Sequence, residues 1–493
     1  PFLIGIVLLF TFQTQSQNIG KDLELLFNDT QLLGLAVSIS INGSHETFNF
    51  GVRDVSRNLP ITNTTHFRIA SISKAFTALA VMKLYDAGIV DLDEDISNYL
   101  GYQVRNPNAV TTPITLRMVL SHRSGLQDGA GYANFQNATF SQTPLPNLNE
   151  LLLPGGNFYT PNIWRLEAPG TYFTYSNLNF GLLGTIIEAV TSERFDVYMK
   201  SEILEPLGID GSFNIQDLTD INELAALYRY QNGTWVPQLD NYEGVMPTPP
   251  DLSGYVPGTN GLYFAPQGGL RCTATDLITF LRFLQEEGND GTLDITPATL
   301  QEMKAIAWDY NGSNGDNYFG LFNRWGLGLH HANTQSNDRI CGVDFGTFIG
   351  HPGEAYGLIS DAFFTSAGAI QFSILINGSR NGYEVGATTS FYTVEEKIFS
   401  TLCAYFQQEL AVGAFETTPF TITPNPASSY VNISSKTDTD FTWQLFSVSG
   451  KSISESSVAA DKNILDVSSL FSGIYFLKIS TPNQTLVKKI SIE

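Results

Sequence analysis

The feature that most restricts the fold is the position of the strand-like segments, which lie at both ends of the first four hundred residues. Residues 35–41 alternate between apolar and small polar side chains, Asn42-Gly43 suits a type I′ turn, and residues 46–52 continue as a return strand. Further strand-like segments lie between residues 325 and 376. Because no strand–helix–strand repeat fills the middle, the pattern predicts an α/β (α+β) fold with a mainly antiparallel sheet.

Helical spacing dominates the segments between these strands. The sequence predicts helices that flank the sheet and form a helical subdomain, at residues 71–87, 180–191 and 276–287, with a closing helix at 391–408. Proline, glycine and asparagine gather at residues 233–269, which indicates a long surface loop of the kind that shapes binding clefts.

The two ends of the chain differ in composition from this central region. Residues 1–17 have the apolar run and the small polar residues of a secretory signal peptide, which we expect to be truncated at its start. We assign residues 20–410 to the main domain and residues 411–422 to a linker. Residues 423–493 contain about five short alternating segments, which predict a small all-β sandwich.

Charge and cysteine content limit the possible partners and cofactors. The net charge of −22 argues against a nucleic-acid partner, because phosphate binding needs a basic face. No segment after the leader is long and apolar enough for a membrane span. The three cysteines allow one disulfide in an oxidising compartment, with the pairing left open, and their spacing predicts no metal site. We expect no cofactor.

Three short motifs carry the candidate chemistry. Ser71 and Lys74 are three residues apart at the start of an apolar helix, which places the amine on the same face as the hydroxyl. A serine hydroxyl needs a base to become a nucleophile, and a lysine serves as one when burial lowers its pKa. Tyr175-Ser176-Asn177 precedes a second apolar helix, and His351-Pro352-Gly353 lies on a predicted strand. No Gly-x-Ser-x-Gly motif is present, so an α/β-hydrolase is not expected.

These motifs, in this order, resemble those of the serine β-lactamase and penicillin-binding-protein superfamily. The resemblance covers about residues 25–408 and is strongest to the branch of class C β-lactamases, D-Ala-D-Ala carboxypeptidases and esterases. It implies a β-lactamase/transpeptidase-like fold and a serine hydrolase that acts through an acyl-enzyme. The implied substrate is a D-amino-acid peptide, an ester or a β-lactam.

The resemblance also implies a role for each motif residue. Ser71 is the acylated nucleophile, Lys74 is its base, and Tyr175 exchanges protons with the leaving group and the deacylating water. Asn177 holds Lys74 and the substrate amide. At the strand edge, His351, Gly353 and Glu354 are the substrate-binding and oxyanion positions, with the backbone N–H groups of Ser71 and Glu354 forming the oxyanion hole.

His351 departs from the lysine that is frequent at this position of the family. A lysine meets a substrate carboxylate as a fixed cation, whereas a histidine is mostly neutral near pH 7. We therefore expect carboxypeptidase or esterase activity rather than efficient β-lactam hydrolysis.

The C-terminal segments resemble the type IX secretion sorting domain of Bacteroidetes. The resemblance rests on the stretches TPNPASSYVNI, SVSGKSI, VSSLFSGIYFLKIS and VKKISIE. It implies contact with the secretion machinery, export through the periplasm and a secreted or cell-surface location.

The sequence leaves two alternative functions open. One is a catalytically silent penicillin-binding-like or surface binding protein on the same fold. The other is an adhesin whose function lies in the C-terminal domain.

Overall fold

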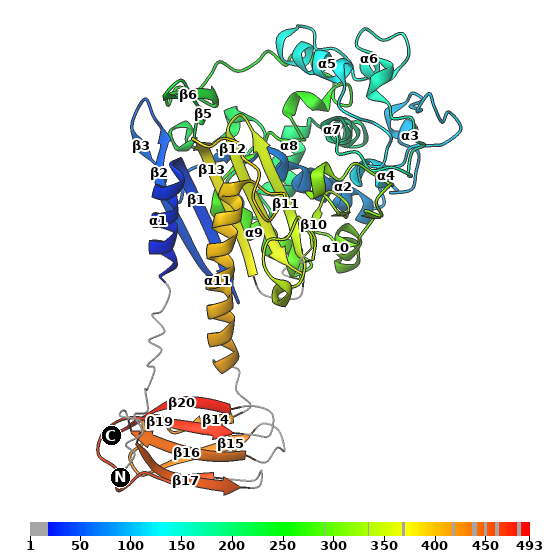
Figure 1. Cartoon of the computed structure of the whole chain (residues 1–493). Coiled ribbons are helices and arrows are strands. Elements are labelled where there is room, and N and C mark those ends of the chain that lie inside the picture. Colours follow the sequence, from blue (N-terminus) through cyan, green and yellow to red (C-terminus); the bar gives the residue numbers. More distant parts are fainter. Residues whose placement is uncertain are drawn as a thin grey trace, which may run out of the picture. The chain divides into compact units, whose positions relative to one another are not determined.

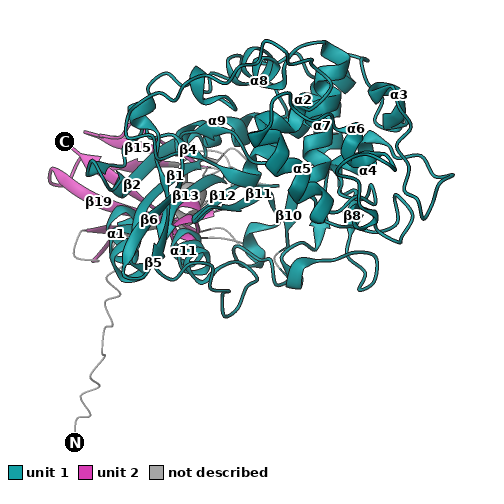
Figure 2. Ribbon diagram, turned by 90° about the horizontal axis from the view of Figure 1, so that it is seen from above, with its two compact units in different colours: residues 1–404 teal, residues 405–493 magenta. Residues whose placement is uncertain are grey.

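The structure is a computed structural model of the whole chain. It describes residues 18–289, 291–333, 335–366, 370–416, 420–435, 441–447, 451–458, 463–480 and 485–493. The predicted signal peptide lies outside the described residues. The chain divides into two compact units, residues 1–404 and 405–493, which Figure 2 shows in different colours.

The first unit is built on a large sheet in which, among the described residues, nine strands follow the order β3-β2-β1-β13-β12-β11-β10-β9-β8. All of its strand pairs are antiparallel. The strands are β1 (Leu32–Ile41), β2 (Ser44–Asp54), β3 (Leu59–Pro60), β8 (Trp308–Asp309), β9 (Arg324–Trp325), β10 (His330–Ala332), β11 (Phe348–Ala355), β12 (Leu358–Thr365) and β13 (Ile370–Ser379). The predicted strands at both ends of the domain thus meet in one sheet.

Helices cover both faces of this sheet (Figure 1). On one face lie α1 (Ile19–Thr30) and α11 (Thr393–Glu416), and on the other lies α9 (Ala274–Gln285), which contacts β1, β12 and β13. All ten residues of β1 are buried, although its sequence alternates like that of a half-exposed strand. The two helical layers explain the difference, because they exclude water from both faces of the strand.

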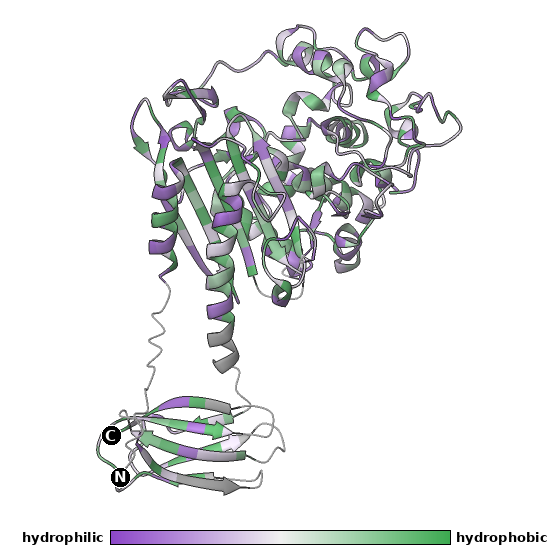
Figure 3. Cartoon of the chain, in the orientation of Figure 1, coloured by the Kyte–Doolittle hydropathy of each residue, from purple (hydrophilic) through white to green (hydrophobic). Residues whose placement is uncertain are grey.

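The predicted helical subdomain is formed by the part of the sequence between the two groups of strands. Its centre is α7 (Asn177–Thr191), which contacts α2 (Ser73–Asp86), α3 (Ile96–Leu100) and α4 (Leu116–Leu120). Around them lie α5 (Ala130–Ser141), α6 (Asn149–Leu152), α8 (Phe195–Met199) and α10 (Pro297–Lys304). One large hydrophobic core joins these helices to the sheet. In Figure 3, apolar residues run along the central strands, and α1 alternates between apolar and polar residues.

Two helix bounds differ from the sequence prediction. The helix expected from residue 71 begins at Ser73, and Ser71 instead belongs to the 3-10 helix η1 (Ala70–Ile72). The closing helix expected at 391–408 runs from Thr393 to Glu416, and β14 begins at Phe420, so both elements extend into the proposed linker. The domain boundaries themselves stay a prediction.

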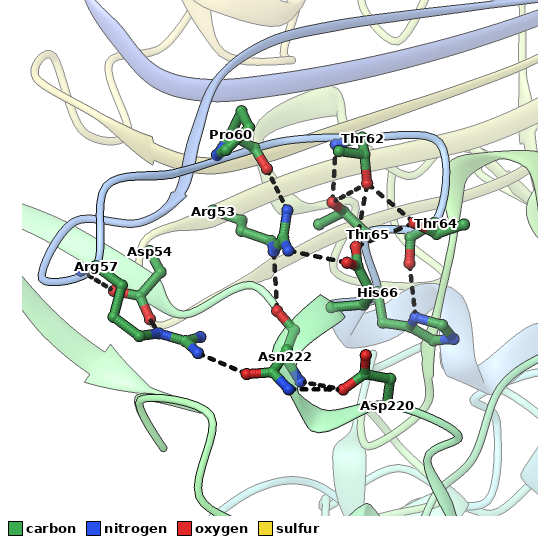
Figure 4. A network of polar contacts seen from close by, with 11 residues as sticks. Arg53, Asp54, Arg57, Pro60, Thr62, Thr64, Thr65, His66, Asp220 and Asn222 are labelled. Carbon is green, nitrogen blue, oxygen red and sulfur yellow. Dashed lines mark hydrogen bonds and ion pairs between the residues drawn. The ribbon is translucent and has the colours of Figure 1, made fainter.

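A network of polar contacts holds the segment that leads to η1 (Figure 4). Arg53 Nε donates to the carbonyl oxygen of Asn222 at 2.9 Å, and Arg53 Nη2 pairs with Glu223 Oε1 at 2.9 Å. Glu223 Oε2 accepts from the hydroxyls of Thr62 and Thr64 at 3.1 and 3.0 Å. The short sheet of β4 (Phe67–Arg68) and β7 (Arg271–Cys272) follows directly, so this network anchors the chain just before residue 71.

The second unit contains two small antiparallel sheets, as the sequence predicts. The first has the order β14-β15-β18 and the second β17-β16-β19-β20. The strands are β14 (Phe420–Thr423), β15 (Tyr430–Ser435), β16 (Phe441–Ser447), β17 (Ser452–Val458), β18 (Asn463–Asp466), β19 (Gly473–Ser480) and β20 (Thr485–Ile492). Side chains from both sheets, Val431, Leu445 and Leu477 among them, share one core, so the unit is a β-sandwich.

The structure gives the cysteine pairing that the sequence left open. Cys341 and Cys403 form a disulfide that ties the segment before β11 to α11, and Cys272 is a buried free thiol. Within the described part of the chain, no helix is both long and apolar enough to cross a membrane.

Candidate active site

The predicted nucleophile lies at a sharp change of backbone direction. Ala70, directly before Ser71, has a φ of 48°, in the left-handed region that non-glycine residues rarely adopt. Strained residues of this kind persist where the surrounding structure holds them, and they concentrate at functional sites. Ser71 is partly exposed and lines a large cavity.

Lys74 lies one helical turn after Ser71 in the chain, and it is buried behind the predicted nucleophile. Its side chain is fully buried, and Nζ is 3.0 Å from Ser71 Oγ, 2.9 Å from Asn177 Oδ1 and 2.7 Å from the carbonyl oxygen of Gln267. The i,i+3 spacing of the sequence motif therefore becomes a direct contact between amine and hydroxyl.

Burial makes this amine a usable base. Loss of solvent lowers the pKa of Lys74 to about 7, although the charge of Asp128 opposes the shift. Near neutral pH a large fraction of Lys74 is thus unprotonated and able to accept the proton of Ser71.

Tyr175 stands against an aromatic wall beside the lysine. Lys74 Nζ lies 4.9 Å from the centroid of its ring, and the ring stacks on Phe322 at 5.0 Å. Burial raises the pKa of Tyr175 well above its usual range, and a hydrogen bond with the Ser71 side chain opposes the rise. Tyr175 is therefore a neutral phenol at rest, and Lys74 is the stronger candidate for the base.

Asp128 is a site residue that the sequence analysis missed. Its carboxylate accepts from Asn177 Nδ2 at 2.8 Å, from the backbone N–H of Asn177 at 3.0 Å and from that of Leu178 at 3.0 Å. These bonds cap the first turn of α7 and turn the Asn177 amide so that its oxygen faces Lys74. No local sequence signal marks Asp128, because its partners lie about fifty residues away.

His122 also supports the site, through contacts with Tyr175 and Ser176. Its Nδ1 accepts from the backbone N–H of Ser176 at 3.1 Å, and its ring centroid lies 4.5 Å from that of Tyr175. Burial lowers the pKa of His122 well below its usual value, so the ring is neutral. This placement gives His122 a structural role beneath Tyr175.

Gly353 brings the edge of β11 against the nucleophile. A Cβ atom at this position would lie 2.7 Å from the carbonyl oxygen of Ile69 and 3.3 Å from the backbone nitrogen of Ser71. In addition, Ser360 Oγ donates to the carbonyl oxygens of Ile69 and Gly353 at 3.1 and 3.2 Å. Only a glycine allows this approach, which sets the Ser71 N–H beside the strand that carries Glu354.

The edge of β11 is free where the site needs it. Among the described residues, the pairing of β11 with β10 ends at Gly350, so the following residues have β12 on one side and the cavity on the other. Pro352, Gly353 and Glu354 all line the cavity. This arrangement suits a substrate that lies along the strand edge.

The side chain of His351 lies behind this edge rather than on it. It is only 1% exposed, its Nδ1 donates to the carbonyl oxygen of Pro352 at 2.5 Å, and its ring packs 5.3 Å from Trp325. Burial lowers the pKa of His351 well below its usual value. The site therefore has no fixed cation at position 351, in agreement with the expectation from sequence.

The cavity that joins these residues has a volume of about 1150 Å³. Besides Ser71, Tyr175 and Asn177, residues from several separate segments line it, among them Arg68, Gln267, Tyr318, Phe319, Leu321, Phe322 and residues 385–392. Phe319 is 99% exposed with a φ of 59°, so a strained turn presents an aromatic ring at the rim. Within the described chain, no group of three or more His, Cys, Asp or Glu side chains is placed to hold a metal ion.

Comparison with known proteins agrees with this geometry. The Beta-lactamase family model matches residues 16–389, and the model of the secretion system C-terminal sorting domain matches residues 421–493. The sorting domain indicates secretion or a cell-surface location.

Individual relatives are more distant. Protein flp of Staphylococcus aureus (strain N315) is 31% identical over 195 residues, which are 39% of this chain and 36% of that protein. The chain thus matches only about a third of the length of that relative. Penicillin-binding protein 4 of Amycolatopsis lactamdurans is 23% identical over 410 residues, which cover 79% of this chain and 91% of that protein.

Solved structures share the fold. The octameric penicillin-binding protein homologue from Pyrococcus abyssi has a TM-score of 0.58 at 20% identity, covering 96% of this chain and 100% of that chain. The D-amino acid amidase from Ochrobactrum anthropi SV3, complexed with L-phenylalanine, has a TM-score of 0.57 at 21% identity, covering 80% of this chain and 100% of that chain.

Proposed function

Since the chain belongs to the Beta-lactamase family, we propose that it is an exported serine hydrolase whose Ser71 is acylated by a D-amino-acid peptide, an ester or a β-lactam. The observation that carries the proposal is the 3.0 Å contact between Lys74 Nζ and Ser71 Oγ at the floor of a large cavity. A buried amine with a pKa of about 7 beside a serine has the chemistry of a base and a nucleophile.

In the proposed acylation step, neutral Lys74 accepts the proton of Ser71 while Oγ attacks the substrate carbonyl. The carbonyl oxygen becomes an oxyanion that the backbone N–H groups of Ser71 and Glu354 stabilise. The proton then passes through Tyr175 to the leaving group, which departs as the carbonyl re-forms. Asn177, held by Asp128, keeps Lys74 in position and has one amide hydrogen left for the substrate.

Deacylation follows the same path in reverse. A water molecule loses a proton to the Lys74–Tyr175 pair and attacks the ester carbonyl, and Ser71 leaves with that proton. The cavity is open enough to admit the water and to release the acid product. Each role is one that a group of this type can perform at the position it holds.

A covalent probe tests the nucleophile directly. A fluorophosphonate should label the full chain, and Ser71→Ala should abolish the labelling. Ser73→Ala is the matched control, because Ser73 Oγ accepts from the backbone N–H of Leu270 at 3.1 Å inside the core. That variant should lose about 1–3 kcal/mol of stability from the unsatisfied N–H yet still be labelled.

Two results would contradict the assignment. If folded Ser73→Ala lost labelling as completely as Ser71→Ala, the assignment of Ser71 as the nucleophile would be wrong. If the wild-type chain resisted labelling, the alternative of a catalytically silent binding protein would be favoured. The intact set of Ser71, Lys74, Tyr175 and Asn177 supports the enzyme, because a binding protein has no need of a buried base.

The neutral state of His351 leads to a prediction about substrate choice. Without a cation at position 351, the carboxylate of a β-lactam loses a strong partner there, whereas a neutral ester loses nothing. We expect turnover of p-nitrophenyl acetate and weak turnover of nitrocefin. Cephalosporin hydrolysis at the rate of a dedicated lactamase would refute this preference for esters or peptides.

A further inference from the structure

Arg68 is a cation of the cavity that the proposed mechanism does not use. It lies three residues before Ser71 and lines the same cavity. Its Nε is buried without a hydrogen-bond partner, and within the described residues the guanidinium makes no ion pair. Its Cζ lies 5.7 Å from the centroid of the Tyr356 ring.

The nearest acid is already occupied. Arg68 lies directly opposite Arg271 in the antiparallel β4–β7 sheet, so the two arginines are neighbours. Arg271 binds both oxygens of the buried Asp240, with Nη2 to Oδ1 at 2.8 Å and Nε to Oδ2 at 3.1 Å. Two cations and one carboxylate leave one positive charge unbalanced beside the nucleophile.

The cavity wall around Arg68 is built to expose this charge. The hairpin turn between β11 and β12 carries Tyr356, and Gly357 packs so closely on β5 (Leu227–Gln231) that a Cβ would lie 2.0 Å from the carbonyl oxygen of Tyr228. That packing places Tyr356 and Arg229 in the same cavity wall, and Arg229 is a second exposed cation there.

Within the described residues, neither Glu354 nor Glu395, which line the cavity, forms an ion pair with Arg68. Glu354 accepts a hydrogen bond from the hydroxyl of Tyr392. Burial, together with the neighbouring Asp361, raises the pKa of Glu395 well above its usual range, which favours its neutral form. Arg68 is partly buried, its Nε has no hydrogen-bond partner, and its side chain faces the cavity. An anion that enters the cavity therefore gains a strong, two-pronged partner.

We propose that Arg68 binds a carboxylate of the substrate, so that, between two acyl donors that are otherwise matched, the enzyme prefers the one with an anionic group. The inference deepens the proposed function and rests on it, because the bound molecule is the acyl donor. The carboxylate has two possible positions, in the acyl part of the substrate or in its leaving group.

Binding to the full chain with Ser71→Ala tests the proposal without turnover. Two matched pairs of anilides place the carboxylate on either side of the scissile amide. Succinanilic acid against butyranilide probes the acyl side, and 3-acetamidobenzoate against 3-methylacetanilide probes the leaving-group side. Calorimetry should give a dissociation constant about tenfold or more lower for the carboxylate of at least one pair.

Variants then assign the preference to Arg68. In the Ser71→Ala background, Arg68→Gln should reduce the carboxylate preference to about one, and Arg68→Lys should reduce it at least about threefold because the two-pronged contact is lost. Lys21→Gln, which removes one exposed positive charge from α1, is the control and should leave the preference unchanged. Thermal unfolding reports whether each variant is folded.

Two results overturn the inference. The first is that neither pair of anilides shows a preference for the carboxylate, and binding too weak to measure counts as this result. The second is a preference that survives in Arg68→Gln or, if that variant fails to fold, stays unchanged in Arg68→Lys. Because Ser71→Ala performs no chemistry, these results are independent of the fluorophosphonate experiment, whose failure would instead contradict the proposed hydrolase.

Discussion

At the scale of single residues, Lys74 and Ser73 show how position decides chemistry. Both are polar, fully buried and close to Ser71 in the sequence. Lys74 reaches into the site and contacts Ser71, Asn177 and Gln267, whereas Ser73 points into the core and holds the backbone of Leu270. The same helix start therefore supplies one group for chemistry and one for packing.

The lowered pKa of Lys74 predicts a pH dependence for the reaction of Ser71. Below pH 7 the amine is protonated and cannot accept the proton of the serine, and above pH 7 it is neutral. The rate of fluorophosphonate labelling should therefore rise about tenfold between pH 6 and pH 8 and then level off.

Lys74→Arg serves as the comparison for this profile. A guanidinium stays protonated throughout this range, so the variant should react slowly at every pH and lose the inflection. A wild-type rate that is flat or that falls as pH rises would show that Lys74 is not the base.

At the scale of elements, the active site depends on how closely β11 approaches η1. The 3-10 turn carries the proposed nucleophile, the strand carries the second proposed oxyanion donor, and Gly353 and Ser360 join the two. A displacement of the strand by a few tenths of an ångström would alter the distance between the two proposed N–H donors to the oxyanion.

Gly353→Ala tests this contact. The new methyl group meets the backbone of Ile69, which cannot move without Ser71, so we expect a loss of about 1–3 kcal/mol of stability together with a large loss of labelling rate. Gly254→Ala is the matched control, because a Cβ there has no neighbour within 4 Å. Full reactivity in folded Gly353→Ala would show that the close approach is not needed.

At the scale of the whole molecule, the disulfide and the C-terminal unit agree with an exported protein. The Cys341–Cys403 bridge closes a separation of 62 residues, and such bridges persist in oxidising compartments. By chain entropy it contributes roughly 2–4 kcal/mol to stability.

Counting thiols checks the bridge. The unfolded chain should react with a thiol reagent at one cysteine, Cys272, and at three after reduction. Reduction should also lower the unfolding temperature of the native chain. Three reactive thiols without reductant, in protein purified from an oxidising compartment, would contradict the pairing.

The sorting domain predicts the fate of the C-terminal unit. If it serves export, the secreted protein should either lose the unit or carry it as an attachment point at the cell surface. Intact-mass measurement of the exported protein distinguishes these outcomes. An unmodified, full-length unit that binds glycans would instead favour the adhesin.

The sequence by itself determined the architecture, the order of the motifs and the family. Strands at both ends of the domain, the Asn42-Gly43 turn and the small C-terminal sandwich all follow from local periodicity and turn chemistry, which short segments encode. Ser71, Lys74, Tyr175 and Asn177 were also recognisable, because their spacing within each motif is local.

Only the tertiary structure decided how these motifs act together. It paired Cys341 with Cys403, placed Asp128 behind Asn177, buried His351 and, among the residues that the structure describes, left Arg68 without an ion-pair partner. Each of these facts depends on residues that are far apart in the chain, and burial lowers the pKa of Lys74 and His351 and raises that of Tyr175. Short sequence motifs specify the residue types of the site, whereas the protonation states and partners of these residues arise only when distant segments pack together.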